Sequence, residues 1–188
     1  MSQNETISDL HSLHRLVWIS LIAALIVIGA YAHFPLGPVP MSLQCLFVLL
    51  AGFILGPVGG LLAVGLYVVS GLAGLPVFHG GHSGLGHLLG PTGGYILGFL
   101  FVPLITGLGR RAAQAGRLGW LRGLGLAVLG YLPIYIFGLS WLKTSLDIAW
   151  LHAAGVGMLP FLPSDVLQIL GSVAVLRGLS RQELLPPA

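Results

Sequence analysis

Two polar side chains near the C-terminus have a spacing that suits the binding of a polar ligand inside an apolar segment. Asp165 and Gln168 stand in the run LPFLPSDVLQIL, and residues three apart lie on one face of a helix. The carboxylate accepts hydrogen bonds, whereas the amide both donates and accepts them. A charge at membrane depth costs about 2.5–3.5 kcal/mol on insertion scales, so such residues usually face a cavity or a partner. The alternative interpretation is an acid in a first helical turn, stabilised there by the helix dipole.

A second polar group lies in the glycine-rich stretch 76–90, PVFHGGHSGLGHLLG. The stretch contains His79, His82 and His87, and imidazoles in such an arrangement could bind a transition metal. Their spacing matches no strong metal motif, and no Cys or carboxylate is near them in the sequence. Solvated loop histidines are therefore the preferred interpretation, and we assign no metal ligand. The adjacent glycines can expose backbone N–H groups to a ligand, or can simply allow the chain to turn.

Catalytic motifs are absent from the sequence. It contains no G-x-x-x-x-G-K-[ST] loop for ATP, no H-E-x-x-H motif and no G-x-S-x-G motif. Of the five carboxylates, Glu5, Asp9 and Glu183 lie in the polar ends, which leaves Asp147 and Asp165. We therefore predict a protein that is not an enzyme, with no catalytic residues and no cofactor.

The composition requires a lipid environment. Charged residues make up only 7% of the 188 positions and apolar residues 56%, whereas soluble domains have about 25% charged residues. The isoelectric point near 9.4 comes from scattered arginines and a formal charge of only +3. That distribution does not indicate a nucleic-acid partner. A spanning helix needs about 20 mostly apolar residues, so the chain has room for about six crossings.

The hydrophobic runs and proline breaks predict an all-α integral membrane protein with six transmembrane helices and both termini cytoplasmic. A cytoplasmic N-terminal leader (1–15) precedes a six-helix membrane-embedded domain (16–177), and a cytoplasmic C-terminal tail (178–188) follows it. Residues 76–90 are expected to be a loop, and residues 143–160 are an ambiguous, re-entrant or interfacial segment. The expected spans are about 16–34, 41–55, 58–75, 91–109, 121–142 and 161–176.

Basic residues test this layout independently. With the N-terminus inside, only Lys143 falls on the outer side, as the positive-inside rule expects. The alternative for the first span is a cleaved signal peptide over residues 11–32, with Ala30-Tyr31-Ala32 as the cleavage site. The arginines assigned to the inner side are Arg15, Arg110, Arg111, Arg117, Arg122, Arg177 and Arg181.

Glycines four residues apart occur at three places in the chain. Small residues at this spacing let transmembrane helices approach each other closely, so we expect a packing role. The pairs are Gly52–Gly56, Gly94–Gly98 and Gly119–Gly123.

Several motifs in combination give the chain its resemblance to a known family. The runs GPVPMSLQCLFVLLAGFILGPVGG, YVVSGLAGLPVFHGG, LLGPTGGYILGF and GMLPFLPSDVLQ resemble the BioY family, the biotin-specific S-components of energy-coupling-factor transporters. The resemblance covers residues 20–177. It implies a six-helix fold in the bacterial cytoplasmic (inner) membrane that binds biotin near its outer face. It also implies two kinds of partner, a transmembrane coupling subunit and two ATPase subunits.

Two positions depart from the family pattern. The family usually has lysine three residues after the acid of the last helix, where this chain has Gln168. Its first helix often has small residues four apart, where Ala23 is here followed by Val27. The substrate-binding residues expected from the motif and from placement on the outer side are Asp165, Gln168, Tyr95, Gln44, Phe78, Gly80 and Gly81.

Two other functions remain open at this level. One is an S-component for a transition-metal ion bound by the outer histidines. The other is a membrane scaffold or a lipid enzyme.

Overall fold

The computed structural model describes residues 3–34, 38–182 and 184–186, which form helices and one short hairpin. In the hairpin His33 pairs with Ser42 and Phe34 with Met41, antiparallel. The elements are α1 Gln3–Tyr31, β1 His33–Phe34, β2 Met41–Ser42, α2 Gln44–Leu72, η1 His79–Gly81, α3 Leu85–Leu89, α4 Gly93–Phe99, α5 Val102–Thr106, η2 Gly107–Gly109, α6 Arg110–Gln114, α7 Trp120–Leu146, α8 Trp150–Gly157, η3 Leu159–Phe161 and α9 Leu162–Arg181.

The described residues form five helical stretches that are long and apolar enough to cross a membrane. The second of them, α2, consists of two helices that meet at Gly56, whose φ of 77° and ψ of −177° are non-helical. Glycine adopts this φ without steric cost, and Pro57 then begins the next helix, where its missing N–H is tolerated. The break lies where the sequence predicted it. The five stretches are Ser12–Tyr31, Gln44–Leu72, Gly93–Gln114, Trp120–Leu146 and Trp150–Arg181.

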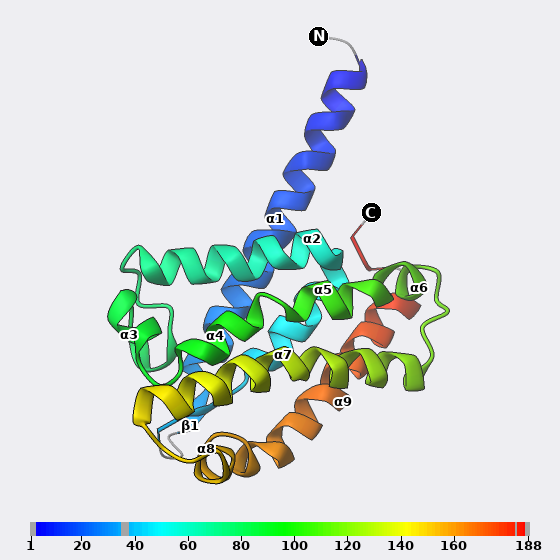
Figure 1. Ribbon diagram of the computed structural model, residues 1–188. Coiled ribbons are helices and arrows are strands. Elements are labelled where there is room, and N and C mark those ends of the chain that lie inside the picture. Colours follow the sequence, from blue (N-terminus) through cyan, green and yellow to red (C-terminus); the bar gives the residue numbers. More distant parts are fainter. Residues whose placement is uncertain (1–2, 35–37, 183, 187–188) are drawn as a thin grey trace.

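The helices run back and forth between two ends of the molecule (Figure 1). The N-terminal part of α1 and the C-terminal end of α9 lie toward one end, together with α6. The hairpin, α8 and the start of α9 lie toward the other end. Strand β2 and the start of α9 are close in space although they are far apart in the sequence, and Gln168 donates to the Ser42 carbonyl.

The structure gives more detail in four of the expected segments. Helix α1 begins at Gln3, so most of the expected leader 1–15 is helical. The stretch 76–90 contains the short helices η1 and α3. The fourth span consists of four short helices, which follow one another along the chain as α4, α5, η2 and α6. The ambiguous segment 143–160 contains the end of α7 and the eight-residue helix α8.

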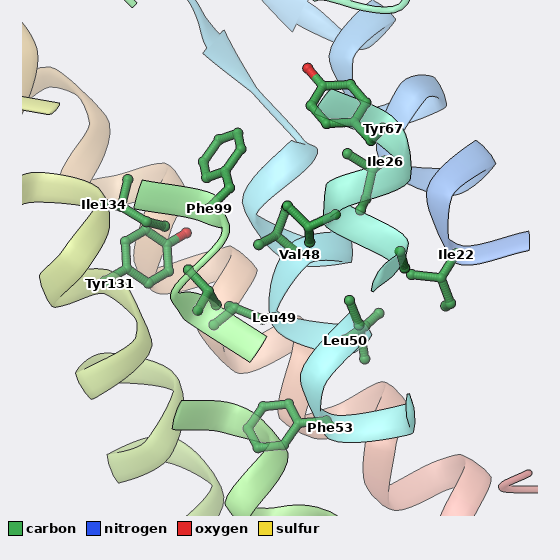
Figure 2. Close-up of a cluster of buried hydrophobic side chains, with 14 of the residues drawn as sticks. Ile22, Ile26, Val48, Leu49, Leu50, Phe53, Tyr67, Phe99, Tyr131 and Ile134 are labelled. Carbon is green, nitrogen blue, oxygen red and sulfur yellow. The ribbon is translucent and has the colours of Figure 1, made fainter. Parts of the chain in front are cut away.

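The core joins α1 to the rest of the bundle (Figure 2). Ile22 and Ile26 of α1 are almost fully buried, as are Val48 and Leu49 of α2. Within a membrane such side chains stabilise the bundle through van der Waals packing rather than through removal from water. Removing α1 as a signal peptide would expose this surface, so the packing favours a retained helix.

Glycines allow close helix contacts at most of the predicted positions. A Cβ on Gly52 would lie 2.7 Å from the Cα of Pro103, and one on Gly98 would lie 2.7 Å from the Cα of Ile134. A Cβ on Gly94 would lie 2.3 Å from the carbonyl oxygen of Phe137. The packing role is confirmed at these three positions. It fails at Gly119, where nothing lies within 4 Å.

Candidate functional site

A cavity lies between the hairpin, the start of α2, α4, α7 and the start of α9. It encloses about 70 Å³, which is less than the roughly 300–1,000 Å³ of pockets that hold drug-sized ligands. A ligand of that size therefore requires side chains or loops at the cavity to move. The lining residues are Val39, Pro40, Met41, Ser42, Gln44, Cys45, His79, Thr92, Tyr95, Ile96, Phe99, Tyr131, Ile134, Tyr135, Gly157, Phe161, Asp165 and Gln168.

Asp165 is the one carboxylate among these lining residues, and only 8% of its surface is exposed. The Tyr135 hydroxyl donates a hydrogen bond to its Oδ2. The Tyr131 hydroxyl is buried near Asp165 and Cys45, and it has no hydrogen-bond partner of good geometry in the described part of the chain. Buried hydroxyls are almost always hydrogen-bonded, so Tyr131 offers a polar group to a ligand. Asp165 therefore faces the cavity, as the sequence predicted.

Gln168 lies beside this cavity, but its amide is engaged by the protein. Its Oε1 accepts the N–H of Leu46 at 2.9 Å, and its Nε2 donates to the carbonyl of Ser42 at 3.1 Å and to the Ser164 hydroxyl at 3.0 Å. The N–H of Leu46 belongs to the first turn of α2, where backbone donors lack partners within the helix. Gln168 therefore acts as a cap supplied by another helix.

Gln44 and Tyr95 also line the cavity and are held in place by hydrogen bonds. The Nε2 of Gln44 donates to the Tyr67 hydroxyl at 2.7 Å. The Tyr95 hydroxyl donates to the carbonyl of Gly157 at 2.8 Å. Tyr95 fits there because Gly138 and Gly157 leave room for it, since a Cβ on either would lie 2.4 Å from its side chain.

The other three candidate residues, Phe78, Gly80 and Gly81, are not among the residues that line the cavity. The Phe78 ring is fully buried, stacks on His87 at 4.9 Å between centroids and meets the Tyr67 ring edge-on. The two glycines have φ values of 67° and 76°, which turn the chain through η1. These residues anchor and shape the loop rather than form the cavity wall.

Four histidines gather above the cavity, and we call His33, His79, His82 and His87 the histidine cluster. The ring centroids of His79 lie 4.6 Å from His87, 5.8 Å from His82 and 6.0 Å from His33. Burial, together with the neighbouring imidazoles of His87, His82 and His33, lowers the pKa of His79 to about 4. Burial and His82 also lower the pKa of His87.

The histidine cluster does not have the geometry of a metal site. No group of three or more His, Cys, Asp or Glu side chains within residues 12–34, 38–182 and 184–186 could hold a metal ion. The imidazoles instead pack against one another, and that of His87 stacks on Phe78. His79 alone of the four reaches the cavity wall.

Sequence reasoning missed several lining residues. Val39, Pro40, Met41 and Thr92 fall in the PVPM and GPTGGY motifs, so those motifs could have indicated them. Tyr131 and Tyr135 are spaced four apart, which places them on one face of α7, but nothing in the sequence pairs that face with Asp165. Apolar side chains that complete the wall are Ile96, Phe99, Ile134 and Phe161.

Comparisons with known proteins agree with this architecture. The model of the BioY family matches residues 1–183. A probable biotin transporter BioY of Pyrococcus horikoshii is 39% identical over 157 residues, which cover 84% of this chain and 90% of the relative. The biotin transporter BioY of Thermotoga maritima is 37% identical over 173 residues, with coverage of 92% and 99%. A crystal structure of the S-component for biotin from an ECF-type ABC transporter superposes with a TM-score of 0.83 at 30% identity, and 100% of both chains is covered.

Proposed function

The chain belongs to the BioY family, and on that premise we propose that it is the biotin-binding S-component of an energy-coupling-factor transporter. It is a membrane transporter subunit and not an enzyme. Biotin is its substrate. The main support for the proposed binding site is the buried carboxylate of Asp165 in an otherwise mostly apolar cavity.

The chemistry of biotin matches the distribution of polar groups in this cavity. The ureido ring carries N–H donors, for which Asp165 is the acceptor, and a carbonyl, for which the Tyr131 hydroxyl is the donor. The thioether ring and the aliphatic tail fit the apolar wall of Ile96, Phe99 and Ile134. A mostly apolar site with a few placed polar groups is typical of small-molecule sites.

The carboxylate of biotin needs a partner other than Gln168. The amide of Gln168 already has three hydrogen bonds, and the lining residues include no Lys or Arg. His79 is the one imidazole among the lining residues, and its ring N–H can donate to a carboxylate. We therefore assign His79 to the tail end of the ligand and Asp165 to the ureido end.

Biotin entry requires the cavity to widen. The small enclosed volume of about 70 Å³ and the hinge-like glycines of η1 support a loop over residues 76–90 that moves aside and closes again. Phe78, Gly80 and Gly81 act in this movement, with Phe78 as the buried anchor.

The proposed topology has six transmembrane helices, counting the two parts of α2 separately, with both termini cytoplasmic. The membrane-embedded domain spans residues 16–177. The membrane is the bacterial cytoplasmic (inner) membrane, and uptake depends on a transmembrane coupling subunit and two ATPase subunits. The asymmetric placement of arginine supports this orientation.

Binding of radiolabelled biotin to the detergent-solubilised chain tests the function. Saturable binding at nanomolar-to-micromolar biotin is expected, with competition by unlabelled biotin. The absence of saturable binding by a folded, monodisperse preparation would refute the proposal.

A further inference from the structure

The cavity of Asp165 has no basic side chain among the described residues that line it. The only lysine of the sequence, Lys143, lies over the Trp150 ring at 5.7 Å and is not one of those residues. The arginines belong to the N-terminal half of α1, to α6, to the connection from α6 into α7 and to the end of α9, which lie toward the end opposite the hairpin (Figure 1). Residues 1–11, 35–37, 183, 187 and 188 include no Lys or Arg. The carboxylate of a ligand in this cavity therefore has no cation to pair with.

Gln168 has no donor left for such a carboxylate. One N–H of its amide is directed to the Ser42 carbonyl and the other to the Ser164 hydroxyl. Its Oε1 accepts the N–H of Leu46, and an amide oxygen can only accept hydrogen bonds. The amide at this position therefore serves the protein and leaves the tail of the ligand without a strong donor.

The other donors of the cavity wall are neutral. The Tyr95 hydroxyl donates to a backbone carbonyl and the Tyr135 hydroxyl to Asp165. The hydroxyl of Tyr131 and the ring N–H of His79 remain for a ligand. Burial and the neighbouring imidazoles lower the pKa of His79 to about 4, so its ring is neutral near pH 7. The described wall thus combines one acid with neutral donors.

This combination gives the site no reason to prefer a charged tail. A carboxylate buried without a cation is costly, and Asp165 disfavours a second negative charge in the same cavity. A neutral N–H or O–H can donate to the carbonyl oxygen of an amide as it does to a carboxylate oxygen. We propose that the cavity binds neutral carboxyl amides of biotin at least as tightly as biotin itself. The inference rests on the proposed function and widens its substrate class to biotin together with its amides.

Competition against radiolabelled biotin on the detergent-solubilised full chain, near neutral pH, tests the inference with biotinamide as the probe. Biotinamide replaces the carboxylate by a neutral group of the same shape. In the parent its dissociation constant should be no more than about threefold that of biotin. A site that pairs the carboxylate with a cation would instead prefer biotin by about 10- to 150-fold, because a hydrogen bond to a charged group is stronger.

A cation added to the wall should create the preference that the parent lacks. Met41 of β2 lines the cavity, and the adjoining β1 carries His33, whose ring lies 6.0 Å from that of His79. Met41→Lys should therefore bind biotinamide about 10- to 150-fold more weakly than biotin. The matched control, Met41→Gln, has a neutral side chain of similar length and should keep the ratio of the parent.

Two results would overturn the inference. One is a preference of the parent for biotin over biotinamide of about tenfold or more, a measurement that needs no variant. The other is the same ratio in the parent, Met41→Lys and Met41→Gln, which would place the tail of the ligand away from this wall. Both leave saturable biotin binding intact, whereas its loss in the parent would refute the proposed function itself.

Discussion

The side-chain oxygen of Gln168 accepts the backbone N–H of Leu46 at 2.9 Å, which ties α9 to the first turn of α2. The two residues are 122 positions apart in the sequence. Gln168 lies one helical turn from Asp165 on α9, but this bond occupies the amide that the sequence assigned to the ligand. It also changes the expected effect of restoring the lysine that the family usually has.

Gln168→Lys should lower the stability of the folded protein, although it restores the residue that the family usually has. Lysine has no acceptor, so the Leu46 N–H would lose its partner, and leaving a buried donor unsatisfied costs about 1–3 kcal/mol. Thermal unfolding in detergent should show a lower midpoint, and biotin binding should weaken. Gln168→Leu removes the same acceptor without adding a charge, so it separates the loss of the capping bond from the burial of a cation. A lysine variant as stable as the parent, with equal or tighter binding, would restore the view that position 168 serves the ligand.

Asp165→Asn should weaken biotin binding by about 10- to 150-fold. A hydrogen bond to a charged group contributes roughly 1.5–3 kcal/mol, at about 1.4 kcal/mol per decade of dissociation constant. Folding should survive, because the substitution removes a costly charge from the membrane region. The matched control is Asp147→Asn at the C-terminal end of α7, where the residue has a φ of 51° that asparagine tolerates. Unchanged affinity in Asp165→Asn would place the ligand elsewhere.

Binding of biotin methyl ester, which has no carboxylate to attract a protonated His79, should weaken as the pH falls from about 6.5 toward 4. The pKa of His79 is lowered to about 4 in the packed histidine cluster, and an open loop returns it toward its usual value of about 6.5. The open loop therefore binds protons more readily, so closure is favoured above about pH 6.5 and is lost as the pH falls through that window. Titration of binding from pH 8 to pH 5 measures this, with biotin methyl ester removing the titration of the ligand itself.

Two variants test whether the histidine cluster, and not another titrating group, causes the pH dependence of binding. His82→Asn removes a neighbour that depresses the pKa of both His79 and His87, and it should flatten the pH profile. His152→Asn, outside the cluster, should leave the profile as in the parent. Identical profiles in all three proteins would show that the cluster does not govern loop closure.

Cysteine labelling should place the 76–90 loop outside and the α6–α7 connection inside. In a Cys45→Ser background, Ser83→Cys should react with a membrane-impermeant thiol reagent in intact cells, whereas Ala115→Cys should react only after permeabilisation. Both positions are exposed, so accessibility to the reagent depends on the side of the membrane. The reversed pattern would invert the proposed topology.

Gly98→Ala should destabilise the contact between α4 and α7. Its Cβ would lie 2.7 Å from the Cα of Ile134, which is backbone and cannot rotate away, and overpacking typically costs about 1–3 kcal/mol. Gly65→Ala is the control, because nothing lies within 4 Å of a Cβ there and alanine is the better helix former. A lower unfolding midpoint is expected for Gly98→Ala alone.

The sequence by itself determined the class of protein and pointed to the carboxylate of the candidate site. The scarcity of charge left lipid as the only medium that could cover the chain, and the apolar runs set the helices because a span needs about 20 such residues. The break at Gly56–Pro57 was predictable since these two residues disfavour a continuous helix. Asp165 was identifiable because a charge within an apolar segment is costly unless it faces a cavity or a partner.

Only the tertiary structure decided which side chains meet Asp165 and what Gln168 does. Tyr131 and Tyr135 lie on another helix, α7. No local sequence pattern predicts which face of α7 packs toward α9. Gln168 and Leu46 meet through the packing of α9 against α2, and the imidazoles of His33 and His79 meet through the hairpin. Spacing along a chain fixes the face of a helix, but the neighbour of that face is set by the packing of the whole bundle.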